Sequence, residues 1–279
     1  MKILWRFITV HLENTGKTIR KVKVNKKDAT IHFTDKTKMK VSLEALANFY
    51  FYEGKTLDNK QIKEINDFSN SAKLLKYAMS LLKKGHYSEW KMREKLYSKE
   101  ANKKDVDRVI KSLKEHDLIN DKMLALDLYE YGNERNLGKN KIIQEISNKG
   151  VFDDVISKLK FPYSLEKKKA SNVLPKLERK YDKYAYEQKK QHIYKALLTL
   201  GFDNDVAMST LSEMKGEDKK EEKNKLDKDF PKTLLHYKRK YEGYELKTKV
   251  IAALKNKGYK MKDILNKWEN SYGENDFGI

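Results

Sequence analysis

The chain has 279 residues, about twice the commonest domain size, and a formal net charge of +20. It contains no cysteine, which excludes disulfides, thiolate metal sites and cysteine catalysis. The charged fraction of 37% is high and the hydrophobic fraction of 39% is low, which favours amphipathic helices with wide solvated faces. The positive excess is spread along the chain and suits an extended acidic or polyanionic partner. A lysine-rich surface that serves only solubility is the alternative.

The first residues are expected to be mature chain. Met1–Glu13 contains an apolar run that Arg6 interrupts, and no small-residue cleavage pattern follows it. No stretch approaches the roughly 18 apolar residues that a membrane span needs. We therefore expect a cytoplasmic protein with no membrane contact.

Residues 1–70 are predicted to form a β-rich region with two short helices. Apolar and polar residues alternate in three segments that polar, turn-like runs separate, as in a small antiparallel meander. These segments are 19–24, 30–33 and 39–43. Leu43–Tyr52 and Asp58–Phe68 should be helices, the first ended by Gly54 and the second capped by Asp58.

From about residue 71 a helical pattern repeats. Small or polar residues that can end a helix recur 50, 51 and 57 residues apart, at Glu100, Gly150, Gly201 and Gly258. Apolar residues stand four and eight positions before each stop, on one face of a helix. They are Met92 and Leu96, Ile142 and Ile146, Ile193 and Leu197, and Val250 and Leu254. Glycine adopts the left-handed conformation that closes a helix at low cost. A third helix should begin behind Asn102 or Asp153 in the first two copies.

The repeat predicts a mostly α fold of tandem three-helix repeats in an elongated curved array, with a small β-rich (α+β) N-terminal region. The predicted repeats are 71–121, 122–170, 171–225 and 226–279. The longer last spacing is assigned to Lys215–Asp229, which is almost entirely charged and is expected to be a mobile loop or a frayed helix end.

No residue pattern indicates catalysis or a cofactor. The six histidines are scattered, and no pair has the spacing of a helical zinc site. No glycine-rich phosphate loop and no nucleophile elbow occur. Asp203-Asn204-Asp205 faintly resembles a calcium loop but lacks its glycine and distal glutamate, so a helix N-cap is the simpler interpretation. We expect a protein that is not an enzyme and has no cofactor or metal.

Several segments resemble the RecX family. Ser88–Leu96 is similar to the family's Ser-x-x-Glu-Leu-x-x-Lys-Leu-type helix, and Leu118–Asp121 is similar to the junction that follows it. Lys141–Val151 is similar to the family's most recognisable segment. The N-terminal region resembles that of long Gram-positive-type members. The chain departs from the pattern at Asp117, where the family has glycine, and at Glu100, where the helix stop is not glycine.

The resemblance implies a regulator that lies in the groove of the RecA–DNA filament and suppresses strand exchange and ATP hydrolysis, in DNA repair by homologous recombination and the SOS response. It implies the RecA filament as partner. We also expect weak nonspecific binding to single- or double-stranded DNA and a monomeric state. Candidate contact residues flank the best-matched helices: Arg93, Lys95, Tyr129, Tyr131, Arg135, Lys139, Lys141 and Lys149. The alternative is that the basic residues form a solvated face and the tyrosines close repeat junctions.

Two other functions fit the sequence. The first is a nonspecific DNA-binding protein acting directly on DNA, because each three-helix repeat loosely resembles a helix-turn-helix. The predicted third helices do not share a basic recognition surface, however: that of the first repeat is rich in lysine, whereas 203–210 contains no cation. The second is a helical-repeat scaffold for another acidic partner.

Overall fold

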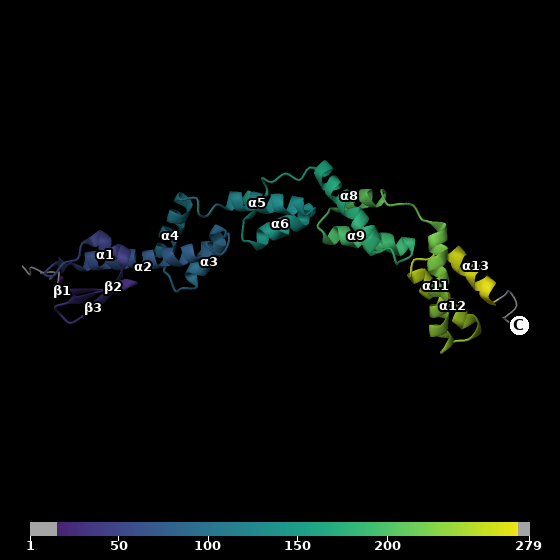
Figure 1. The fold of residues 1–279 in the computed structure, drawn as a ribbon, viewed down its shortest axis with the longest axis horizontal. Helices are drawn as coiled ribbons and strands as arrows, with labels where there is room; N and C mark the ends of the chain where they lie inside the picture. Colours follow the sequence, from purple (N-terminus) through teal and green to yellow (C-terminus); the bar gives the residue numbers. More distant parts are fainter. Residues whose placement is uncertain (1–15, 273–279) are drawn as a thin grey trace, which may run out of the picture. The chain divides into compact units, whose positions relative to one another are not determined.

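The computed structural model describes residues 16–272, so the expectation for Met1–Glu13 lies outside the described part. That part contains 13 helices and one four-stranded antiparallel sheet near the N-terminus (Figure 1). The predicted fold class, mostly α with a small β-rich N-terminal region, is confirmed. Among the described residues, no helix has the length and apolar character needed to cross a membrane.

The chain divides into two compact units. The first contains the described residues up to Leu124 together with Lys149–Val151. The second contains Ala125–Asn148 and the described residues from Phe152 onward. Each unit has two clusters of buried apolar residues. In the first unit, one cluster lies under the sheet and the other lies among the helices that follow it. In the second unit, each cluster belongs mainly to one group of helices.

The predicted meander is present in the first unit. A fourth, short strand pairs with the free edge of the first, so the strand order is β3-β2-β1-β4. The strands are β1 (Lys17–Val24), β2 (Asp28–Phe33), β3 (Lys38–Ser42) and β4 (Thr56–Leu57). Alternate residues such as Ile31 and Val41 are buried in a core that two helices cover, α1 (Leu43–Phe49) and α2 (Asn59–Leu82). The residues between them point to the other face.

The two N-terminal helices differ from the prediction at their C-terminal ends. α1 ends before Gly54, because Tyr50 already adopts the left-handed conformation. Asp58 caps α2 as predicted, and its carboxylate accepts a hydrogen bond from the backbone N–H of Gln61 (2.7 Å). The predicted end of α2 at Phe68 is wrong: the helix continues for four more turns, because its second half packs in the core of the following helices.

After α2, helices follow in groups of three, the second half of α2 serving as the first member of the first group. They are α3 (Glu89–Tyr97) and α4 (Lys103–Glu115); α5 (Asp121–Glu134), α6 (Lys139–Asn148) and α7 (Asp153–Ile156); α8 (Tyr163–Lys180), α9 (Tyr186–Thr199) and α10 (Asn204–Leu211); and α11 (Lys219–Lys238), α12 (Gly243–Asn256) and α13 (Met261–Tyr272). The division into four repeats stays a proposal. α8 runs through the boundary proposed at 170/171 and α11 through that at 225/226.

The four predicted helix stops are confirmed. Glu100, Gly150, Gly201 and Gly258 all have a positive φ, between 58° and 93°. The middle helices α3, α6, α9 and α12 end just before them. All eight apolar residues predicted for the buried face are fully buried, at 0% exposure. Asn102 caps α4 as predicted, whereas Asp203 stands at the start of α10 without a capping hydrogen bond.

The prediction for Lys215–Asp229 is wrong. Most of the segment forms the first half of α11, where the Asp218 carboxylate accepts hydrogen bonds from the backbone N–H groups of Lys220 and Glu221. Leu226 is buried in the last apolar cluster. A single apolar residue in so charged a segment gives no periodic signal, and its tertiary partners supply the stability.

Candidate partner-binding surface

The middle helix of one group begins against the end of the middle helix of the next group. The backbone N–H groups of Gly138 and Asn140, at the start of α6, donate to the carbonyls of Leu200 and Gly201 at the end of α9 (2.8 and 2.9 Å). The positive pole of one helix therefore meets the negative pole of the other. A Cβ added to Gly201 would lie 2.5 Å from the Cβ of Lys141, so no larger residue fits.

The other two glycine stops make the same approach. A Cβ on Gly258 would lie 2.7 Å from the backbone nitrogen of Gln188 at the start of α9. A Cβ on Gly150 would lie 2.9 Å from Oγ of Ser88, the N-cap of α3. Glu100 is exposed. At three stops, glycine is therefore needed both for the left-handed φ and for close packing against a neighbouring helix. At Glu100 only the left-handed φ is required.

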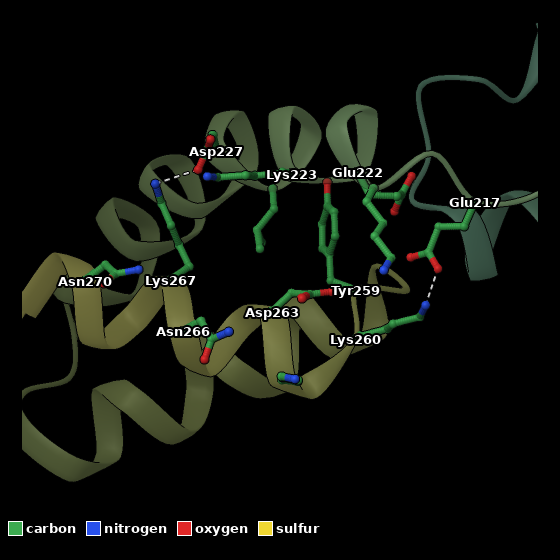
Figure 2. A pocket seen from close by; sticks show the side chains of 13 residues that line it. Glu217, Glu222, Lys223, Asp227, Tyr259, Lys260, Asp263, Asn266, Lys267 and Asn270 are labelled. Carbon is green, nitrogen blue, oxygen red and sulfur yellow. Dashed lines mark hydrogen bonds and ion pairs between the residues drawn. The ribbon is translucent and has the colours of Figure 1, made fainter.

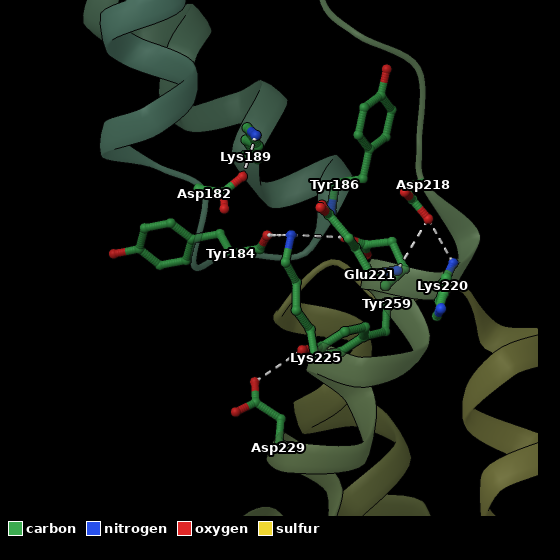
Figure 3. Close-up of polar contacts among 11 residues, drawn as sticks. Asp182, Tyr184, Tyr186, Lys189, Asp218, Lys220, Glu221, Lys225, Asp229 and Tyr259 are labelled. Atoms are coloured by element: carbon green, nitrogen blue, oxygen red, sulfur yellow. Dashed lines mark hydrogen bonds and ion pairs between the residues drawn. The ribbon is translucent and has the colours of Figure 1, made fainter.

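A glutamate and a lysine on the first helices of the last two groups, α8 and α11, complete this junction. Figure 3 shows the instance between α9 and α11, where Lys225 reaches the carbonyl of Tyr184 (3.2 Å). Glu222 accepts a hydrogen bond from the backbone N–H of Tyr186 (3.0 Å) and lies 3.3 Å from Nζ of Lys225. The carboxylate thus satisfies a free N–H at the start of α9, and the lysine balances its charge.

The same arrangement joins α6 to α8. Glu166 accepts a hydrogen bond from the backbone N–H of Lys139 (2.9 Å), and Lys169 lies 2.6 Å from Glu166 and donates to the carbonyl of Leu137 (2.7 Å). Glu166 and Lys169 are both buried. We call these paired residues the junction clamps. No sequence pattern singles them out, because glutamate and lysine three residues apart are common on charged helices.

Arg93, predicted as an exposed contact residue, is partly buried and bound within the chain. Its guanidinium lies 2.9 Å from Glu89 and 2.6 Å from Asp107, and so connects α3 to α4. Burial lowers the pKa of Arg93, but the hydrogen bonds to Asp107 and Glu89 outweigh it and the pKa is raised. Lys114 shares Glu89 (2.8 Å). Arg93 therefore has a structural role in the first unit.

Tyr129 and Lys139 also make contacts within the second unit. The Tyr129 hydroxyl donates to the carbonyl of Lys160 (2.8 Å), and its ring packs edge-on against Phe161 (5.2 Å between centroids). Nζ of Lys139 lies 3.8 Å from Asp203, in addition to its backbone bond in the junction clamp. Lys139 thus contributes to the contact between two helix groups, and Tyr129 fixes the segment between α7 and α8.

Tyr131, in the last turn of α5, and Arg135, just after the helix end, form an exposed pair. The guanidinium of Arg135 stands 5.1 Å from the centroid of the Tyr131 ring, and Tyr131 is 53% exposed. Glu145, on α6, lies 3.9 Å from the guanidinium. We call Tyr131 and Arg135 the α5 pair. A stacked guanidinium keeps several N–H donors free for an acidic group.

The remaining three predicted residues are lysines. Lys141 donates to the side chain of Gln144 (2.9 Å) at the start of α6. Lys95 and Lys149 are exposed and make no ion pair within residues 16–272. Both lie in the first unit, whereas the α5 pair lies in the second, so the structure joins only Tyr131 to Arg135 as one contact site.

A hollow between α11 and α13 is lined by charges of both signs (Figure 2). These charges pair with one another: Lys260 with Glu217, and Lys267 with Asp227 (2.6 Å). Burial, followed by the nearby Asp229, raises the pKa of Tyr259 at its edge. Its lining is nearly balanced, with five lysines and four carboxylates, so its polar groups hold helices together and do not indicate a ligand. In the described part of the chain, no cluster of metal-binding side chains is found.

Comparisons with known proteins give one family. No family model matches the chain. Regulatory protein RecX of Listeria welshimeri serovar 6b is 30% identical over 240 residues, which are 84% of this chain and 88% of the relative. Regulatory protein RecX of Streptococcus pyogenes serotype M4 is 29% identical over 259 residues, 90% of this chain and 98% of the relative. A crystal structure of regulatory protein RecX matches with a TM-score of 0.57 and 24% identity, and covers 71% of this chain and 100% of that one. Together with the recurring helix groups, this similarity shows that the chain belongs to the RecX family of regulatory proteins.

Proposed function

We propose that this protein regulates a RecA-type recombinase by binding its filament on DNA, without chemistry of its own. The name of its relatives supports a regulatory role. The observation that carries the proposal is the recurrence of one junction along the chain, with the same helix contact and the same clamp at Glu166 and Glu222. Packed repeats present similar surfaces at regular intervals, which suits a partner whose subunits also repeat.

The α5 pair is the proposed anchor on the partner. An arginine held over a tyrosine ring needs little further ordering on binding, so more of the interaction energy appears as affinity. Its planar fork fits a carboxylate or a phosphate. Aromatic and arginine residues are also those that dominate protein interfaces. Lys95 and Lys149 add positive charge that speeds encounter with an acidic polymer.

Regulation would work by selecting one state of the filament. A ligand shifts an equilibrium only by its different affinity for the two states. A chain that contacts neighbouring recombinase subunits at once favours a single spacing between them. If that spacing is poor at ATP turnover or at extension, bound regulator slows both.

Direct action on DNA as a helix-turn-helix protein fits less well. The basic residues of α4 are the best candidates for a recognition helix. Lys104 lies 3.2 Å from Asp67 and Lys114 lies 2.8 Å from Glu89. Arg108 donates to the hydroxyl of Ser71 (2.9 Å). Cations that are already bound within the chain are poor readers of bases, so α4 is not proposed as a DNA-recognition helix.

The test is ATP hydrolysis by the cognate recombinase on single-stranded DNA, with this protein titrated at two salt concentrations. We expect inhibition at well below one molecule per recombinase subunit. Inhibition that appears only when the protein coats the DNA, and that high salt abolishes, would instead favour direct DNA binding.

A matched pair of variants tests the proposed anchor. Tyr131→Ala/Arg135→Ala should raise the concentration needed for half-inhibition by about tenfold or more, as expected for a hot spot. Tyr244→Ala/Arg239→Ala removes an exposed tyrosine and an exposed arginine elsewhere in the second unit and should have little effect. Equal effects of the two double variants would contradict the role of the α5 pair.

A further inference from the structure

The outer face of the N-terminal sheet carries basic residues side by side on three adjacent strands. Lys21 of β1 pairs with His32 of β2, and His32 pairs with Lys38 of β3. Their neighbours Ile31 and Met39 are buried in the core, so this row points to the opposite, open face. A second row beside it is formed by Lys23, Thr30 and Lys40.

Two further cations extend the first row into a shallow hollow of about 320 Å³. Arg20 lies next to Lys21 at a bulge in β1, and Lys36 lies in the turn before β3, where its φ is positive. The hollow is lined by Arg20, Lys21, His32, Phe33, Lys36 and Lys38. Its lining therefore has four cationic side chains, one histidine and no carboxylate. We call these basic residues the sheet patch.

The sheet patch is not neutralised within the chain. Its four cations make no ion pair in the part of the chain that the structure describes. Two carboxylates of the sheet and its turns are used by other lysines, Asp28 by Lys40 (2.8 Å) and Asp35 by Lys17 (2.9 Å). The hydroxyl of Thr37, followed by Lys17, lowers the pKa of Asp35 to about 2, and hydrogen bonds from Lys40 and Asn25 lower the pKa of Asp28, so both carboxylates are ionised and committed elsewhere.

The cations of the sheet patch line one hollow on one face, where like charges repel one another. By contrast, Arg93 of α3 and Lys114 of α4 have carboxylate partners within the chain. The sheet patch keeps its cations together and unpaired, which suits an anionic partner that is absent when the protein is alone. The three-strand row spans about 10 Å, two strand spacings, which is enough to contact two neighbouring phosphates of a nucleic-acid strand.

We propose that the sheet patch binds single-stranded DNA through its phosphate backbone. The phenyl ring of Phe33 is buried, so the imidazole of His32 is the one ring in the hollow on which a base could stack; phosphate contacts carry no sequence information and stacking is sequence-tolerant, so binding should depend little on sequence. An open face with no buried polar side chain also suits a polymer better than a small anion. The inference deepens the proposed function, because it gives the regulator a DNA contact separate from its contact with the recombinase.

The test uses the full chain and a fluorescein-labelled oligonucleotide of 30 thymidines, with no recombinase present. Binding is measured by fluorescence anisotropy between about 50 and 200 mM salt. Lys21→Gln/Lys38→Gln should weaken binding roughly 10- to 100-fold at 50 mM salt, and should reduce the slope of log affinity against log salt by about 1.4, the loss of two phosphate contacts on a single strand. Circular dichroism checks that the variant is folded.

The matched control is Lys83→Gln/Lys84→Gln, which removes the same charge from exposed lysines just after α2 in the same unit. It should change affinity less than threefold. Equal losses in the two double variants would overturn the proposal, because affinity would then follow net charge alone. A second outcome would also overturn it. If Lys21→Gln/Lys38→Gln binds DNA as well as wild type but no longer binds a polyglutamate peptide, the patch is a site for acidic protein. Because the assay contains no recombinase, a negative result here is distinct from failure of the proposed regulation.

Discussion

Replacing Gly201 by alanine tests whether the glycine stops are required for packing between helix groups. Gly201 has a φ of +93°, which costs an L-residue about 1–2 kcal/mol. The new Cβ would also lie 2.5 Å from the Cβ of Lys141, and overpacking of this kind costs about 1–3 kcal/mol. Gly201→Ala should therefore destabilise the second unit by about 2–5 kcal/mol.

Gly243 provides the control within the same unit. It also has a positive φ, +52°, but a Cβ there would meet nothing within 4 Å. Gly243→Ala should cost only the backbone contribution, about 1 kcal/mol. Urea denaturation followed by circular dichroism gives the overall change, and amide hydrogen exchange of peptides from α6 and α9 locates it. If Gly201→Ala costs no more than Gly243→Ala, the close approach contributes nothing and the packing argument is refuted.

Three further predictions concern charge and burial. Lys169→Met should destabilise the second unit by about 3–5 kcal/mol in urea denaturation, because it leaves Glu166 buried without its partner, and adding Glu166→Gln should recover part of the loss. Lys114 lowers the pKa of Glu89, so the stability that Glu89 provides is present at neutral pH and lost as pH falls through its folded pKa. The difference in unfolding free energy between wild type and Glu89→Gln, about 1 kcal/mol at pH 7, should therefore shrink below pH 4.5. A difference that does not change with pH would contradict the assignment. Phe230→Ala should cost about 3–5 kcal/mol and increase hydrogen exchange throughout α11, whereas a frayed segment would show no such change.

The frame of the helix groups could be predicted from the sequence because its signals are local. An apolar residue at every fourth position fixes the buried face of a helix, and a glycine that follows fixes its end. Ile193, Leu197 and Gly201 are one such set, and each has the predicted burial or φ. The meander could be predicted for the same reason, since alternation identifies one buried face of a strand.

What the sequence did not predict depends on residues that are distant along the chain. Arg93 is an exposed cation by pattern alone, and its partner Asp107 belongs to the next helix. Glu222 is one of many carboxylates in a charged segment, and only the packed structure places it at the start of α9. In the sequence, His32 of the sheet patch stands between two apolar residues, and only cross-strand pairing places it between two lysines.

The exception among the helix stops follows from the same packing. Gly150, Gly201 and Gly258 each receive the start of the preceding middle helix, but α3 is the first middle helix, so no earlier one packs against Glu100. A left-handed glutamate there costs only backbone strain, and Glu100→Gly should leave stability unchanged or raise it by up to about 1 kcal/mol. Glycine at a stop thus signals that another group precedes it, and a different residue marks the first group. Alanine at a glycine stop should therefore weaken the packing between neighbouring groups, whereas substitution at Glu100 alters only its own helix end.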